Sequence, residues 1–342
     1  MTTAIGLLVW AAGLLLLPAP LAARIMLLGP LVVVPRLLGA LPRRGWAAGL
    51  AEWPALLAAI VLTLSFAVPA GPAAALLTAP WLAVAGAGAA AAVIDGLRAL
   101  PAILHPRRAA DLGADASVVF LAVGATFATM DRLGAQPLGF SPTIVLLTAT
   151  HFHFAGFGLL GLASIGAAAR PALRGAVLGF IVGIPVTALG FTLPSTLFGA
   201  LGALIVGGSG IVFALDLIGS SRTGRARWPH RVAGLALLVG MPMGIAWSVA
   251  ILLGVRFLDV DAMVRSHGAL NATAVLIAVV ALPRRATSRG HATESMTTIT
   301  LTTDIAAPID RVFDLARDLD LHAASMAATG ERAIGGRTAG RI

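Results

Sequence analysis

Residues 141–168 read SPTIVLLTATHFHFAGFGLLGLASIGAA, and this stretch decides the class of fold. A helix of about 20 apolar residues crosses the hydrocarbon core of a bilayer. The stretch is longer than that and contains no acidic residue, lysine or arginine. His151 and His153 lie near its middle, where ionisable side chains are costly and are rarely kept without a partner or a task. The two imidazoles therefore mark the strongest candidate for a functional site.

The composition of the whole chain agrees with a polytopic membrane protein. Of the 342 residues, 58% are hydrophobic and only 11% are charged, against about 25% charged residues in soluble domains. The absence of cysteine excludes disulfides, thiolate nucleophiles and cysteine metal sites. A net charge of +9 can indicate a nucleic-acid partner. The arginines are scattered between apolar runs, however, so we expect the lipid bilayer and not nucleic acid as the partner.

Apolar runs along the chain predict an all-α bundle of nine membrane crossings. They lie near residues 3–20, 48–68, 73–94, 115–134, 141–167, 172–191, 196–219, 231–255 and 263–282. Residues 25–41 are also apolar but are interrupted by Pro30, Pro35 and Arg36. This segment could be a tenth crossing, a re-entrant piece or an interfacial helix.

Arginines occur in every second connection between these crossings, which predicts the orientation of the bundle. The basic groups follow the first, third, fifth, seventh and ninth crossings: Arg24, Arg36, Arg43 and Arg44; Arg98, Arg107 and Arg108; Arg170 and Arg174; Arg222, Arg225, Arg227 and Arg231; Arg284, Arg285 and Arg289. Basic loops stay in the cytoplasm, so we expect an inner-membrane protein with a cytoplasmic C-terminus. The first residues carry no basic side chain, which disfavours a cleaved signal peptide.

Polar side chains converge on the outer half of the predicted bundle. His151 lies about 14 Å from the outer end of its crossing. His267 and Asn271 are four residues apart in the last crossing and share one helix face. Asp131 closes the fourth crossing at its outer end. We therefore predict a site for a small solute or ion formed by His151, His153, His267, Asn271 and Asp131.

The two central histidines are about 200° apart on a regular helix, so both face one site only if the helix is distorted there. We expect His151 to face the site and His153 to bond a neighbouring helix. The alternative for each histidine is a packing role, because interhelical hydrogen bonds commonly join membrane helices. Asp131 could likewise form only an interfacial ion pair with the adjacent Arg132.

The same side chains allow a metal or haem site. His151, His153 and His267, with Asp131, could supply three or four ligands to zinc, copper or iron. Two facing histidines could instead ligate a b-type haem. No motif in the chain indicates a nucleophile or a nucleotide loop, so the sequence does not favour an enzyme.

Two motifs carry a family resemblance. Residues 150–157 read THFHFAGF, and residues 263–272 read MVRSHGALNA far downstream. With both motifs in this order, the chain resembles the YndJ-like bacterial membrane proteins over roughly residues 1–285. Members of that family are sometimes described as transporters. The resemblance implies an integral membrane protein with its site at these two motifs.

The C-terminal segment has a different pattern. Residues 297–305 alternate as a strand does, and a helix is predicted after Pro308 because Ile309, Val312, Phe313 and Ala316 share one face. The run IAAPIDRVF at 305–313 resembles the opening of the START/polyketide-cyclase (SRPBCC) helix-grip superfamily. We expect residues 286–296 to be a linker and residues 297–342 to be an incomplete α+β fragment in the cytoplasm. The helix that closes the ligand cavity of that superfamily is missing, so its cavity is not expected here.

Three functions remain open from the sequence. The first is a transporter of a small solute or ion, in which a histidine near its ordinary pKa could couple movement to protons. The second is a membrane metalloprotein or b-haem protein that uses the same histidines as ligands. The third is a non-catalytic bundle that tethers a soluble ligand-binding module. A homo-oligomer is compatible with all three.

Overall fold

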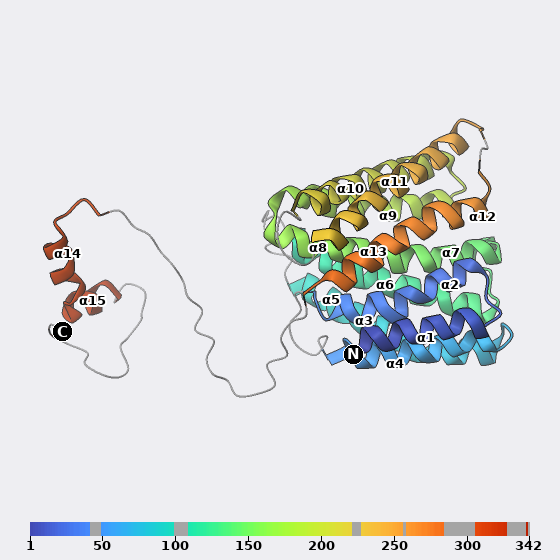
Figure 1. Ribbon diagram of the computed structural model, residues 1–342, viewed down its shortest axis with the longest axis horizontal. Helices are drawn as coiled ribbons and strands as arrows, with labels where there is room; N and C mark the ends of the chain where they lie inside the picture. Colours follow the sequence, from blue (N-terminus) through green and yellow to red (C-terminus); the bar gives the residue numbers. More distant parts are fainter. Residues whose placement is uncertain are drawn as a thin grey trace. The chain divides into compact units, whose positions relative to one another are not determined.

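The computed structural model describes residues 1–41, 49–98, 109–220, 227–255, 258–283, 305–326 and 340. Two compact units divide the chain, Met1–Arg285 and Ala286–Ile342. The first unit is a bundle of helices that run side by side (Figure 1). The described residues form helices and contain no strand. The predicted all-α bundle is therefore confirmed.

Eight helical segments of the described chain are long and apolar enough to cross a membrane. They are Leu21–Leu38 (α2, η1 and α3), Pro72–Arg98 (α5), Ala109–Leu133 (α6), Pro142–Ala169 (α7, η7 and α8), Pro171–Thr192 (η8 and α9), Thr196–Gly219 (α10), Arg227–Leu252 (α11) and Val260–Ala281 (α12, η9 and α13). Two shorter apolar helices accompany them, Thr2–Leu16 (α1) and Trp53–Ala67 (α4 and η3). The sequence predicts crossings at all of these positions, with residues 25–41 as the uncertain one.

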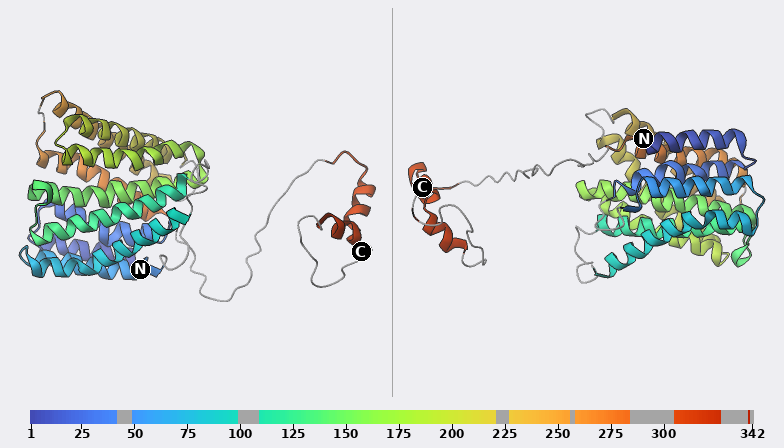
Figure 2. Two further views of the ribbon diagram at one scale, coloured as in Figure 1. Left: turned by 180° about the vertical axis from the view of Figure 1, so that it is seen from behind. Right: turned by 90° about the horizontal axis from the view of Figure 1, so that it is seen from below.

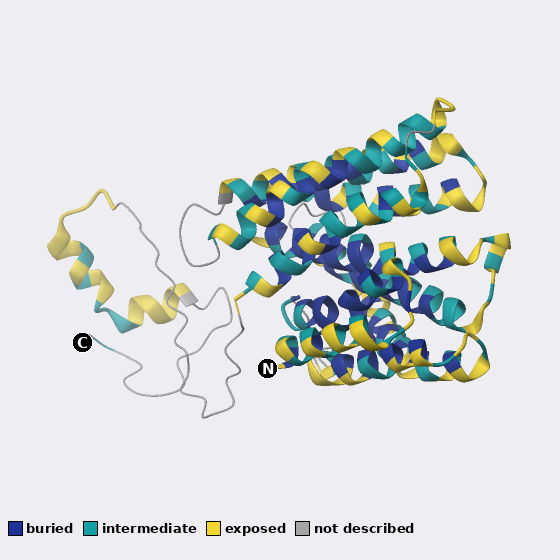
Figure 3. Ribbon diagram, turned by 45° about the vertical axis from the view of Figure 1, so that its right-hand side comes forward, coloured by how far each residue is buried: buried dark blue, intermediate teal, exposed yellow. Residues whose placement is uncertain are grey.

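Large apolar side chains cover the outside of the bundle. Leu15, Leu76 and Leu235 are among those most exposed. Buried residues gather on the inner faces of the helices (Figure 3). An exposed apolar surface of this extent suits a hydrocarbon environment better than water. The bundle is therefore a multi-pass membrane protein by its surface as well as by the length of its helices.

The segment of uncertain role, residues 25–41, belongs to the interior of the bundle. It is continuous with Leu21–Leu38, in which α2 (Leu21–Leu28) passes through the π-helix η1 (Gly29–Val33) into α3 (Val34–Leu38). Its apolar window is 78% buried, equal to that of Pro142–Ala169 and higher than that of the other candidate crossings. A side chain at Gly6 of α1 would overlap the Leu31 carbonyl, so α1 packs directly on η1. The segment is therefore a buried, continuous helical part of the bundle that is long and apolar enough to cross a membrane.

The position of Arg24 also differs from the prediction. The sequence grouped it with Arg36 in one basic connection, but α2 already begins at Leu21. Arg24 and Arg36 consequently lie near opposite ends of one helical segment, about 18 Å apart along its axis. The indole N–H of Trp10 donates to the Arg24 carbonyl at 2.7 Å, which fixes the turn between α1 and α2. Arg24 therefore belongs to the end of the bundle where arginines are few.

Helices α9 (Arg174–Thr192), α10 (Thr196–Ser220) and α11 (Arg227–Leu252) form a layer of three antiparallel neighbours (Figure 2). Glycines let the first two approach closely. A Cβ at Gly202 would overlap the Thr187 hydroxyl, and a Cβ at Gly190 would lie 2.5 Å from the Gly199 amide nitrogen. Close backbone contact of this kind stabilises membrane helices, where dispersion replaces the hydrophobic effect. Helix α11 then contacts α13 (Ala269–Ala281), which joins the layer to the rest of the bundle.

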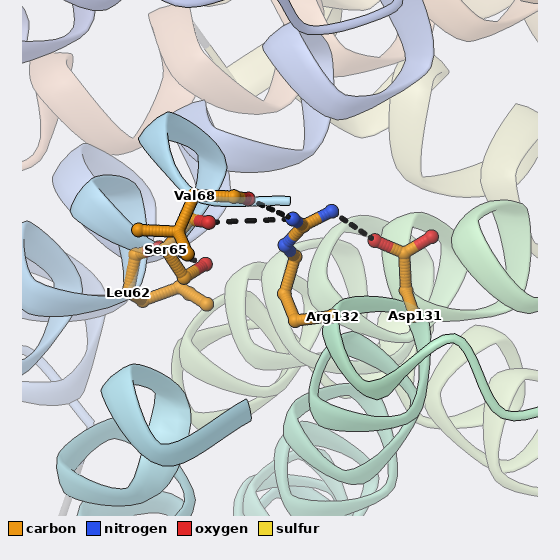
Figure 4. Close-up of polar contacts among 5 residues, drawn as sticks. All are labelled: Leu62, Ser65, Val68, Asp131 and Arg132. Atoms are coloured by element: carbon orange, nitrogen blue, oxygen red, sulfur yellow. Dashed lines mark hydrogen bonds and ion pairs between the residues drawn. The ribbon is translucent and has the colours of Figure 1, made fainter. Parts of the chain in front are cut away.

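Charged groups join helices at both ends of the bundle. At the end where the arginine-containing connections lie, here called the arginine-rich end, Arg170 after α8 (Leu160–Ala169) pairs with Asp216 of α10 at 2.7 Å. At the opposite, arginine-poor end, Arg132 donates to the carbonyls of Ser65 and Val68 at 3.3 and 2.8 Å (Figure 4). These carbonyls lie at the end of the segment formed by α4 (Trp53–Leu64) and η3 (Ser65–Ala67), where the Ser65 carbonyl also accepts from the Val68 N–H at 3.3 Å. Arg132 thus caps one crossing from another.

The second unit is small in its described part. It consists of α14 (Ile309–Ala316) and α15 (Leu319–Met326), with an ion pair between Arg317 and Asp314 at 2.9 Å. The helix predicted after Pro308 is confirmed by α14. The predicted strand at 297–305 and the linker at 286–296 lie outside the described residues, apart from Ile305.

Candidate functional site: a cavity lined by two histidines

A partly open cavity of about 490 Å³ lies in the first unit, between α7 (Pro142–His151), the three-helix layer and the last crossing. Leu138, Phe140 and Val260 border it at the arginine-poor end. His151, His267 and Asn271 line it together. Two crossings far apart in sequence therefore contribute polar side chains to one space, and we refer to it as the His151 cavity. Its size is typical of sites for small organic ligands.

Both histidines of the cavity stand at distorted turns. The π-helix η7 (Phe152–Leu159) begins directly after His151, and η9 (Val264–Gly268), another π-helix, contains His267. A π-turn widens the helix by one residue and redirects the following side chains, and such turns are frequent at functional sites. The third π-segment, η1, contacts η7 from the interior of the bundle. The distortion that a shared site of His151 and His153 would need is thus present, although it does not bring the two rings together.

His151 presents a free acceptor to the cavity. Its Nδ1 lies 2.7 Å from the Leu147 carbonyl oxygen. A carbonyl only accepts, so Nδ1 carries the proton and donates it. In the neutral ring Nε2 then holds a lone pair. The side chain is exposed to this internal space, in contrast to the buried Phe152 and His153 that follow it.

His267 and Asn271 form a polar pair on one face of the last crossing. His267 Nδ1 donates to the Gly240 carbonyl of α11 at 2.8 Å. The amide nitrogen of Asn271 lies 3.1 Å from His267 Nδ1 and 3.4 Å from Nε2. Because Nδ1 is the protonated nitrogen, Nε2 is the one that can accept from the amide. The other end of the amide, Oδ1, is buried without a hydrogen-bond partner among the described residues.

Two glycines of α11 receive this pair. A Cβ at Gly240 would overlap the Asn271 side-chain oxygen, and a Cβ at Gly244 would lie 2.7 Å from His267 Cε1. The glycines and the polar residues have the same spacing of four, which places each set on one helix face. The polar pair therefore fits a groove that only glycine leaves open.

His153 has a different role from His151. Its side chain is 0% exposed. Nδ1 donates to the Ala149 carbonyl at 2.7 Å, and Nε2 accepts from the Trp81 indole N–H of α5 at 3.1 Å. Its ring stacks on Trp81 with a centroid distance of 5.7 Å, and Gly29 and Gly124 contact it from two further helices. His153 therefore joins helices in the core and does not line the cavity.

Asp131 also lies outside the cavity. Its carboxylate pairs with Arg132 at 3.6 Å, and both side chains are largely buried. The Arg132 guanidinium lies 4.5 Å from the Phe66 ring centroid and caps the carbonyls described above. The predicted ion pair of Asp131 with Arg132 is therefore present, and the carboxylate does not line the cavity with His151 and His267.

The donor set does not fit a metal ion or a haem. No three His, Asp or Glu side chains of the described ranges lie close enough together to hold a metal. Both ring nitrogens of His153 are engaged by protein groups, and those of His267 are engaged by the Gly240 carbonyl and the Asn271 amide. Only His151 keeps a free ring nitrogen among the three candidates, whereas a b-type haem with two histidine ligands needs two.

Sequence reasoning did not find several groups that shape the site. Trp81 and the glycines of α11 lie in stretches without a charged or hydroxyl side chain, residues 79–94 and 232–247. A signal existed in the glycines, because Gly240 and Gly244 repeat the spacing of His267 and Asn271. Without the pairing of α11 with the last crossing, that match has no meaning.

Fold and site together define a polytopic helical membrane protein with an internal cavity lined by two histidines and an asparagine. The chain belongs to the YndJ-like protein family, whose model matches residues 24–275. That match covers most of the first unit and both histidine motifs. No significant match to the chain occurs among curated proteins or solved structures. The resemblance of the C-terminal segment to the helix-grip superfamily stays a prediction.

Proposed function

We propose that the protein is a multi-pass inner-membrane transporter that binds a small solute in the His151 cavity. The observation that carries this proposal is the convergence of His151, His267 and Asn271 on one cavity from two separate crossings. Ionisable side chains at membrane depth mark substrate pathways when they face a cavity in the bundle. The cavity is bordered by loop residues at the arginine-poor end, which is the outer end if basic loops stay in the cytoplasm. On the same rule the C-terminal unit is cytoplasmic.

In this proposal the layer of α9, α10 and α11 is the part that moves. Pro185 interrupts α9 and Pro242 interrupts α11, and residues next to both prolines line the cavity. A proline inside a helix removes one backbone hydrogen bond and is a common place for bending. At the arginine-rich end the layer is held by the ion pair of Arg170 and Asp216. Opening a path to the cytoplasm would require this pair to separate.

A packing role is the competing explanation, and His153 fits it well. Both of its nitrogens bond protein groups inside the core. His151 does not fit it, because its only recorded bond is to its own helix and its second nitrogen is left over. The two histidines should therefore respond differently to substitution, with His153 required for stability and His151 for solute binding.

The test uses purified protein in lipid nanodiscs and a panel of small solutes scored by thermal stabilisation. Wild type, His151→Ala and the matched control His230→Ala are compared, since His230 lies on α11 outside the cavity. We expect solutes that raise the melting temperature of wild type and control but not of His151→Ala. Such solutes should then be taken up by proteoliposomes in a manner that depends on His151. If His151→Ala responds to every solute as wild type does, the proposal is wrong.

A further inference from the structure

The lining of the His151 cavity carries no formal charge when its two histidines are neutral. Among the described residues that border it there is no aspartate, glutamate or arginine. An ion placed in such a space would lose its hydration without gaining a counter-charge, which is costly. The cavity is therefore suited to an uncharged molecule.

Most hydrogen-bond donors around the cavity are already used, and among its described lining residues only the Ser248 hydroxyl has no recorded bond. Four threonine hydroxyls that line it donate to carbonyls four residues earlier on their own helices, at 2.7 to 2.9 Å: Thr148, Thr150, Thr187 and Thr192. The indole N–H of Trp247 donates to the Leu258 carbonyl at 3.1 Å. In both cavity histidines the Nδ1–H group donates to a backbone carbonyl.

One acceptor is left over. His151 lines the cavity and its Nε2 has no recorded partner, whereas the unpartnered Asn271 Oδ1 is buried against Gly240 of α11. A buried acceptor without a donor is unfavourable, so a molecule that brings a donor gains more than one that brings an acceptor. The free nitrogen of His151 thus selects for a hydroxyl or N–H group on the ligand, and a ligand hydroxyl could in addition accept from Ser248.

The remainder of the lining is apolar and rich in aromatic rings. Phe127, Phe140, Phe154 and Phe191 border the cavity, together with aliphatic side chains from the same helices. A volume of about 490 Å³ admits one molecule of modest size. The body of the ligand should therefore be a compact apolar or aromatic group.

We propose that the ligand class of this site is an uncharged, largely apolar molecule that donates one hydrogen bond from a hydroxyl or N–H group to His151 Nε2. This inference rests on the proposed function, because it names the solute for the same cavity. It also narrows that function, since it excludes inorganic ions and organic anions as the solute.

The experiment compares four probes of one shape: 1-naphthol, naphthalene, 1-naphthoate and 1-naphthylmethylammonium. Binding to the full chain in nanodiscs is measured as the excess over empty nanodiscs, which removes partition into lipid. We expect 1-naphthol to bind about fivefold to tenfold more tightly than naphthalene, as one net hydrogen bond gives. The anion and the cation should bind more weakly than 1-naphthol.

Variants identify the acceptor. His151→Leu should lower 1-naphthol affinity to that of naphthalene and leave naphthalene unchanged. His151→Gln, which keeps an acceptor, should retain part of the preference, and the control His230→Leu should retain all of it. Equal binding of 1-naphthol and naphthalene by wild type would overturn the ligand class while the cavity remained a binding site. Tightest binding of either charged probe would also overturn it. Absence of binding by all four probes would overturn this inference, whereas the proposed function would still be decided by the solute panel and His151→Ala.

Discussion

The buried bond between Trp81 and His153 gives a prediction whose magnitude follows from the structure. Trp81→Phe removes the indole donor that lies 3.1 Å from His153 Nε2. Because both side chains are 0% exposed, neither water nor lipid can replace that donor. The orphaned acceptor should cost about 1–3 kcal/mol of unfolding free energy, and the lost ring volume adds to this. His153→Leu should cost a similar amount by leaving the indole N–H unpaired.

A double-mutant cycle separates the bond from the lost packing. Trp81→Phe combined with His153→Leu removes both partners of the bond. The loss of unfolding free energy in the double variant should therefore be smaller than the sum of the losses in the two single variants. Hydrogen bonds between membrane helices give coupling energies of about 0.6 kcal/mol on average and up to about 1.7 kcal/mol. We expect the upper part of that range, since the pair is fully buried and also stacked at 5.7 Å.

The assay is reversible unfolding in mixed micelles, followed by far-ultraviolet circular dichroism so that tryptophan substitution does not disturb the signal. Trp81→Phe with His230→Leu is the control cycle, because these positions share no recorded contact and should be additive. A Trp81–His153 coupling energy no larger than that of the control would refute the reasoning that His153 joins helices through this bond.

Three further predictions concern other contacts of the bundle, and each is read from the same unfolding measurement. Gly240→Ala should destabilise the protein by about 1–3 kcal/mol more than Gly208→Ala, since a methyl group at 240 meets the Asn271 side chain and one at 208 meets nothing within 4 Å; equal effects would contradict the groove. Arg132→Met should lower the unfolding free energy by about 2–3 kcal/mol, because the Ser65 and Val68 carbonyls lose their donor and Asp131 loses its ion-pair partner. Arg132→Lys should have an intermediate effect. A neutral Arg132→Met would refute the cap. Arg170→Gln should cost only about 1 kcal/mol, because that side chain is 39% exposed; a charge exchange of Arg170 and Asp216 that recovered none of the loss would count against the ion pair.

Much of the bundle could be predicted because hydropathy reports directly on the membrane. Apolar runs gave the helices that the structure contains, and the 200° separation of His151 and His153 assigned different faces to them. Residues 25–41 were harder, since Pro30 and Pro35 argue against an ordinary crossing. In the structure a π-turn at Gly29–Val33 accommodates this part of the chain, and neighbouring helices surround it. The local sequence does not show which helices pack around this segment.

The sequence predicted some of the residues that line the cavity and also included residues that do not. His267 and Asn271 could be paired because helix periodicity places residues four apart on one face. Asp131 was included from its depth alone, whereas the carboxylate pairs with Arg132 and lies outside the cavity. Arg24 was misplaced for a related reason: the turn at residues 17–20 sets the helix boundary, and composition did not locate it. Depth along a crossing can be estimated from sequence, but the direction of a side chain requires the packing of the bundle.

The central claim is that His151 faces a cavity bordered by loop residues at the arginine-poor end, while His153 is buried between helices. The chain has no native cysteine, so single variants His151→Cys and His153→Cys can be labelled in oriented membranes with a small impermeant thiol reagent. We expect Cys at 151 to react from the side opposite the arginine-rich loops, and Cys at 153 to stay unreacted until the protein unfolds. Equal labelling of the two positions, or reaction of 151 only from the arginine-rich side, would contradict the account.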